Sequence, residues 1–101
     1  MVKRNLDLLL EDFEEFCTND IISGKAKSYK HAIRYLCDFL NITSINESEL
    51  ETIKNAKDSL KNVNSKTYID CLEFLKSRNQ SSYLLKGFIN SAISHFSVFM
   101  K

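Results

Sequence analysis

The residues best suited to phosphate chemistry in this chain are His31 and Arg34, which form an H-x-x-R pattern. Similar pairs occur in phosphoryl-transfer sites, but a two-residue pattern arises often by chance, and no second arginine cluster accompanies this one. Four carboxylates crowd positions 11–15, yet neighbouring helix positions point in different directions and no histidine lies among them. The sequence also contains no glycine-rich phosphate loop, Ser-His-Asp set, metal-ligand quartet or nucleotide fingerprint. We therefore expect no enzymatic activity, no cofactor and no bound metal.

Although catalysis is not expected, seven basic side chains are spaced so that they could bind an anion. They are Lys25, Lys27, Lys30, His31, Arg34, Lys76 and Arg78. Those between positions 27 and 34 recur every three or four residues, which places them on one strip of a helix predicted over 26–41. The pair at 76 and 78 ends another predicted helix, beside the polar segment 79–82 and the free amides of the next helix. Such groups hold phosphates and set the salt dependence of binding rather than a sequence preference.

The formal net charge of +1 hides an uneven distribution of charge along the chain. Residues 1–20 hold two bases and six acids, whereas residues 24–40 hold four bases and one acid, Asp38. No carboxylate side chain follows Glu73. This distribution is typical of a surface with one side facing an anion. Ordinary solvated helix faces are the alternative interpretation.

The composition predicts one helical domain. The 101 residues, 44% of them hydrophobic, are enough for a single core spanning 1–101. With no proline and two glycines, the chain lacks the turn-formers of a hairpin-rich β fold. Its three cysteines lie far apart without C-x-x-C spacing, which predicts buried free thiols and a cytoplasmic location. No apolar run approaches the roughly 18 residues of a membrane span, so we expect no membrane association.

Apolar periodicity predicts five helices, over 5–22, 26–41, 46–61, 66–78 and 82–100. The last carries the widest apolar face and is the expected core helix, with Gly87 and Ser91 forming a notch for a neighbouring helix. Asn41 is expected to end the second helix. The third helix has two possible capping boxes, Ser44-x-x-Glu47 and Asn46-x-x-Glu49, and a polar link ending at 65 caps the fourth. The predicted fold class is a compact all-α five-helix bundle.

Two stretches resemble a known pattern. Residues 28–40 resemble one helix of SAM-like domains, because they match its pattern at Ser28-Tyr29, Ala32-Ile33, Leu36 and Phe39-Leu40. Residues 80–99 resemble the closing helix of the same group. These domains form the N-terminal, core-binding region of tyrosine recombinases and integrases, and also occur fused to restriction-type nucleases. The resemblance implies a SAM-like orthogonal bundle that clamps duplex DNA. The positions that would carry this role are Lys27, Lys30, Arg34, Lys76 and Arg78.

The chain departs from that family in lacking a catalytic domain and in being less basic than a dedicated clamp. Our hypothesis is a non-enzymatic module that binds double-stranded DNA in a DNA recombination or restriction system, with a catalytic domain or a protein partner as a further candidate partner. The alternative is a module for protein interaction or dimerisation, such as an adaptor or a small phage or bacterial regulator. That alternative predicts an exposed apolar patch made by Phe39, Phe74, Val98 and Phe99.

Overall fold

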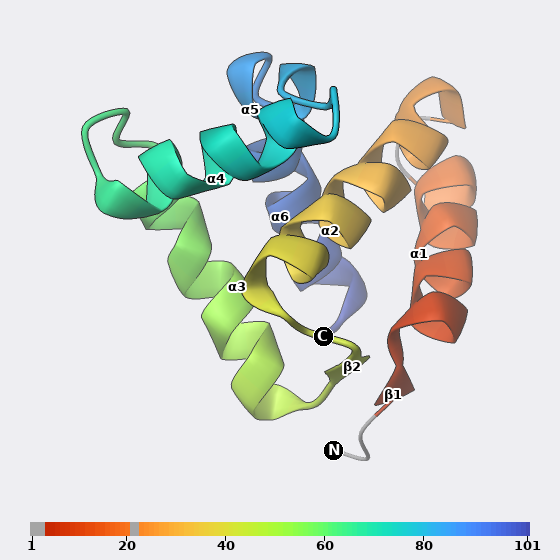
Figure 1. Ribbon diagram of the computed structural model, residues 1–101. Helices are drawn as coiled ribbons and strands as arrows, with labels where there is room; N and C mark the ends of the chain where they lie inside the picture. The colour runs from red at the N-terminus through yellow and green to blue at the C-terminus, as the bar shows by residue number, and fades with distance from the viewer. Residues whose placement is uncertain (1–3, 21–22) are drawn as a thin grey trace.

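The computed structural model describes residues 4–20 and 23–101 (Figure 1). Over these residues it has six α-helices, one 3₁₀ turn and one pair of very short strands. In chain order they are β1 (Arg4–Asn5), α1 (Leu6–Asp20), the 3₁₀ turn (Ser23–Lys25), α2 (Ala26–Leu40), β2 (Ser44–Ile45), α3 (Glu47–Leu60), α4 (Lys66–Ser77), α5 (Ser82–Leu85) and α6 (Phe88–Phe99). The all-α prediction is confirmed. The predicted end of the first helix, at 21–22, lies outside the described residues.

Helix α6 lies at the centre of the molecule, as the width of its apolar face predicts. It packs against α1, α2, α3 and α5, and Figure 1 shows it running behind α2. The ring of Phe96 is fully buried and meets that of Phe13 edge-on, with 5.1 Å between centroids. Phe99 lies against Phe13 and Phe16, at 5.5 and 5.3 Å. These rings join the C-terminal half of α6 to α1, which accounts for the burial of that face.

Helices α1 and α2 run antiparallel along one side of the core (Figure 1). Each buries residues at three- and four-residue spacing, among them Leu9, Phe13 and Cys17 on α1 and Ile33 and Cys37 on α2. The prediction that Asn41 ends α2 is confirmed. This residue has a left-handed backbone (φ 60°), and its N–H points to the carbonyls of Cys37 and Asp38.

The start of α3 has one of the two predicted capping boxes. Asn46 Oδ1 accepts from the N–H groups of Ser48 and Glu49, and the Glu49 carboxylate accepts from the Asn46 N–H at 3.2 Å. The prediction that Ser44 begins the box is wrong. Ser44 lies in β2, where it pairs with Asn5 of β1, and α3 begins three residues later at Glu47. The predicted cap at Ser65 is confirmed, since its Oγ accepts from the Tyr68 N–H at 3.0 Å.

The prediction of a single last helix is wrong, because the chain breaks between α5 and α6. Gly87 has φ 77°, a left-handed conformation that interrupts the helical hydrogen bonds. The predicted notch for a neighbouring helix is wrong too, since a Cβ built on Gly87 would meet no atom within 4 Å. Leu85 has an apolar side chain within the predicted last helix, but it lies at the end of α5 and is 60% exposed. The glycine is therefore needed for the backbone turn and not for close helix packing.

Candidate nucleic-acid interface

The predicted basic strip of α2 faces the acidic side of α1. Lys30 Nζ lies 3.0 Å from Glu11 Oε1 and 2.8 Å from Glu14 Oε1, and the guanidinium of Arg34 pairs with Asp7. The three acids follow a three- and four-residue spacing, so one strip of α1 runs beside one strip of α2. Two predicted phosphate ligands are therefore held in ion pairs between the helices.

The pKa values of Lys30 and Glu14 are shifted by the contacts between them. The hydrogen bond that Lys30 donates to Glu14 holds the pKa of the carboxyl below its ordinary value, with smaller effects from Lys27 and His31. The reciprocal bonds to Glu14 and Glu11 raise the pKa of Lys30. Because only 21% of the Lys30 side chain is exposed, a phosphate would have to displace carboxylates that already contact its ammonium.

The remaining predicted residues at the start of α2 are more open. Lys25, at the position preceding α2, and Lys27 are exposed. His31 is half-buried, and its ring centroid lies 6.4 Å from that of Tyr35. Among the residues described here, neither lysine has a carboxylate within ion-pair distance, so both stay available to an external anion.

The end of α4 comes against the C-terminal half of α2. The Arg78 guanidinium carbon lies 4.4 Å from the centre of the Phe74 ring, and one of its nitrogens is 3.6 Å from Asp38 Oδ2. Asp38 follows Arg34 by one helical turn. Arg34 and Arg78 thus lie on the same side of the molecule, with one acid between them.

Lys86 belongs to this region but was not among the residues predicted from the sequence. It follows α5 directly and is exposed, as are Lys76 and Arg78. Within the described residues, neither Lys76 nor Lys86 forms an ion pair. The signal that could have found Lys86 is the absence of carboxylate side chains after Glu73. We call Lys76, Arg78 and Lys86 the α4–α5 basic surface.

The predicted anion site at the start of the last helix loses its basis. Helix α5 has only four residues, and the Ser81 side chain caps none of its amides. So short a helix has little macrodipole to offer an anion. Any anion held at this end of the molecule is therefore held by the basic side chains.

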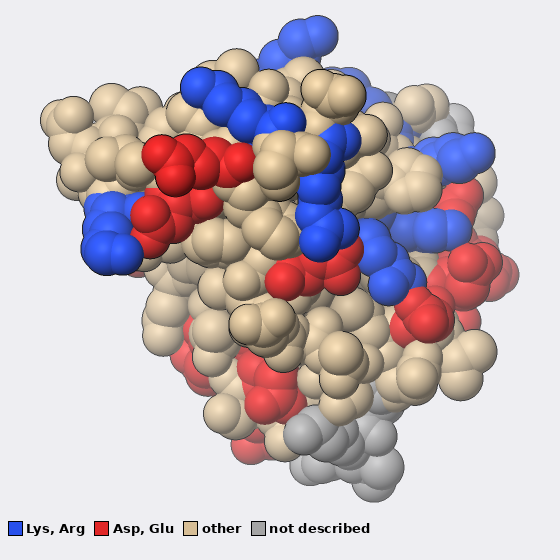
Figure 2. Space-filling view, viewed as in Figure 1, with Lys and Arg blue, Asp and Glu red and all other residues tan. Residues whose placement is uncertain are grey.

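Figure 2 shows how charge is spread over this side of the molecule. Lys and Arg side chains occupy the upper part of the view, where Figure 1 has α4, α5 and the first half of α2. Carboxylates lie among them, consistent with the ion pairs of Lys30, Arg34 and Arg78. At the lower left of the view the charged groups that show are carboxylates. The surface is lopsided, as the charge distribution along the chain indicates, but the basic side is partly neutralised.

Half-buried rings link α2 to α5 and α6 within this side. The Tyr35 and Tyr83 rings meet at an angle of 60° with centroids 5.2 Å apart, and Tyr83 lies 5.9 Å from Phe88. His31 extends the row beyond Tyr35. Burial, with a smaller effect from Tyr35, raises the pKa of Tyr83, so its phenol is uncharged at neutral pH.

The apolar patch expected of a protein-interaction module does not form from the four predicted residues. Phe39 and Phe74 pack against each other, with centroids 5.6 Å apart, and Phe99 packs on α1. All three are half-buried against the core, and only Val98 of the four is largely exposed, at 55%.

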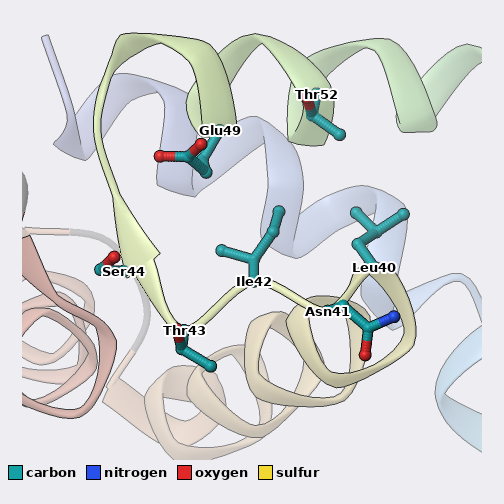
Figure 3. A pocket seen from close by; sticks show the side chains of 7 residues that line it. All are labelled: Leu40, Asn41, Ile42, Thr43, Ser44, Glu49 and Thr52. Atoms are coloured by element: carbon teal, nitrogen blue, oxygen red, sulfur yellow. The ribbon is translucent and has the colours of Figure 1, made fainter.

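Two hollows on the described part of the surface have no catalytic features. One, about 290 Å³, lies between α3 and the loop after α2 (Figure 3). Glu49 is the one carboxylate among its lining residues, and it already accepts a hydrogen bond in the capping box. The other lies on α1 beside Glu11, Glu14, Glu15 and Thr18. No group of three or more His, Cys, Asp or Glu side chains in the described ranges is placed to hold a metal ion.

The three cysteines are not placed to act as nucleophiles. All are free and buried, and burial raises the pKa to about 11 for Cys17 and Cys71 and about 12 for Cys37. A thiol with such a pKa has very little thiolate near neutral pH. Across the described part of the chain, no helix has the length and apolar character needed to cross a membrane.

No family model, curated protein or solved structure matches this chain. The class that the fold and the candidate site define is a small all-α protein whose candidate basic residues lie on an open surface and line neither of the two hollows.

Proposed function

We propose that this chain is a non-enzymatic DNA-binding module that contacts phosphates through the α4–α5 basic surface, with Lys25 and Lys27 as additional contacts. The finer arrangement, a SAM-like bundle of the recombinase or restriction-nuclease type, is proposed with it. Its support is the resemblance of residues 28–40 and 80–99, with α5 and α6 together taking the place of one closing helix.

The observation that carries the proposal is the imbalance of charge at the end of α4. Three exposed bases lie within residues 76–86, and no carboxylate side chain occurs from 74 to 101. The acid that reaches them is Asp38, 3.6 Å from Arg78. This is a looser contact than the pairs that hold Lys30, so Arg78 can turn to a phosphate at lower cost.

The proposed DNA-binding surface contains fewer of the basic residues than the sequence predicts. Lys30 and Arg34 contact α1, and using either for DNA would leave Asp7, Glu11 or Glu14 without its partner and close to a phosphate. We therefore assign these two residues to the packing of α1 on α2. His31, half-buried beside Tyr35, is not among the proposed phosphate contacts.

The test is the salt dependence of binding to random duplex DNA. Three to five phosphate contacts give a slope of log affinity against log salt of about −2.7 to −4.5. Replacing Lys76 and Lys86 by glutamine removes two contacts and should make the slope shallower by about 1.8. The same change at Lys30 and Arg34 should not make it shallower.

A control of equal charge is the pair Lys61 and Lys66, which are also exposed, with Lys66 paired to Asp70 at 2.9 Å. Lys66 lies at the opposite end of α4 from Lys76, about 15 Å along the helix axis. Glutamine at both control positions changes the net charge equally and should leave the slope unchanged. Binding by the Lys76 and Lys86 variant with the parent slope would show that this surface does not contact DNA.

A further inference from the structure

The row of rings suggests which form of nucleic acid the surface takes. His31, Tyr35, Tyr83 and Phe88 form a continuous row, with successive centroids 5.2 to 6.4 Å apart. All four are half-buried, so each keeps some surface open to solvent. The steep angle between the tyrosines means that the edge of one ring meets the face of the other, so this contact covers no more than one face of one ring.

Cations flank this row at both ends. Lys27 lies one turn before His31 on the same face of α2, and Lys86 lies three residues after Tyr83. Arg78 lies against Phe74, whose ring packs on Phe39 one turn beyond Tyr35. Aromatic rings beside basic side chains are the usual combination in proteins that bind unpaired strands, because bases stack on the rings while cations hold the phosphates.

We propose that this surface binds single-stranded rather than double-stranded nucleic acid, with unpaired bases stacking on Tyr35 and Tyr83 while Lys27, Arg78 and Lys86 hold the phosphates. This inference rests on the proposed function and replaces its duplex with a single strand. In a duplex the bases are stacked inside the helix, where these rings cannot reach them, so the rings add affinity only for unpaired bases. The neutral phenol of Tyr83 adds no repulsion toward a polyanion.

The experiment compares two probes of about 12 nucleotides, an oligothymidylate and a random duplex, at about 50 mM salt. The parent should bind the single strand more tightly than the duplex. Leucine at both Tyr35 and Tyr83 keeps apolar bulk but removes the rings, and should weaken single-strand binding by about thirtyfold or more. Phenylalanine at both positions keeps the rings and should stay close to the parent, as should duplex binding by either variant.

The outcomes separate the two proposals. Failure of the parent to bind either probe overturns the proposed function together with this inference. Equal or tighter binding to the duplex, or unchanged single-strand affinity in the leucine variant, overturns the inference and leaves the proposed function standing. A purely structural role of the rings would lower thermal stability in the leucine variant without changing the preference between the probes.

A second measurement covers the case in which the leucine variant does not fold. The chain has four tyrosines and no tryptophan, so its intrinsic fluorescence comes from tyrosine. Saturation of the parent with the oligothymidylate should quench this emission, since bases stacked on Tyr35 and Tyr83 would contact two of the four emitters. Unchanged emission at saturation overturns the inference.

Discussion

Replacing Gly87 by alanine should destabilise the protein, whereas helix propensity alone predicts the opposite. Gly87 has φ 77°, and a Cβ added there would meet no atom within 4 Å. The cost is therefore conformational, about 1–2 kcal/mol for placing an L-residue in the left-handed region. In an uninterrupted helix over 82–100, the same substitution would stabilise by about 0.5–1 kcal/mol. The sign of the effect distinguishes the two structures.

Gly24 provides a matched control. Its added Cβ would also meet nothing within 4 Å, but its backbone does not have a positive φ. Alanine at Gly24 should leave stability unchanged or raise it by up to about 1 kcal/mol, because it restricts the unfolded chain. Asparagine at Gly87 should cost less than alanine, since asparagine tolerates the left-handed region better.

Thermal unfolding followed by circular dichroism measures these differences. In a domain of this size 1 kcal/mol corresponds to about 4–8 °C in Tm, so alanine at Gly87 should lower Tm by about 4–16 °C. A rise in Tm equal to that of the Gly24 variant would refute the reasoning. It would mean that α5 and α6 form one continuous helix, in which the glycine only lowers helix stability.

Three further predictions concern local contacts. Because Lys30 lowers the pKa of Glu14 from its ordinary 4.5, the bond stabilises the fold above that value and is lost as pH falls through the folded pKa. The difference in urea stability between parent and a Lys30→Gln variant should therefore shrink below about pH 4.5; a constant difference would contradict this. Asn46→Ala should cost about 1 kcal/mol in chemical denaturation, while Ser44→Ala, outside the cap, should cost clearly less. The three buried cysteines should react with a thiol reagent near pH 8 only after denaturation, and fast labelling of the native protein would contradict their burial.

Local signals explain what could be predicted from the sequence. The Asn46 capping box and the left-handed Asn41 depend on residues within four positions of one another, so spacing alone identifies them. The core position of α6 follows from its wide apolar face, which has to be covered on several sides. Gly87 was ambiguous because a glycine in a periodic apolar run can allow close packing or end a helix.

The neutralisation of the basic strip could not be predicted because it depends on contacts between distant positions. Lys30 pairs with Glu14 across 16 residues, and Arg34 pairs with Asp7 across 27. The sequence shows an acidic helix and a basic helix, and both patterns are equally compatible with two solvated faces. Only the antiparallel packing of α1 on α2 turns the two strips toward one another, and so moves the candidate interface toward α4 and α5.

The pairing of β1 with β2 determines where a reporter group can be attached. Arg4 pairs with Ile45 and Asn5 with Ser44, which anchors the chain ahead of α1 beside the start of α3. In Figure 1 this anchor lies at the end of the molecule opposite α5. A fluorophore or an immobilising tether placed ahead of β1 would leave the surface around residues 76–86 turned toward the solution. Sensor-chip and anisotropy measurements of oligonucleotide binding can therefore use that position without blocking the region under test.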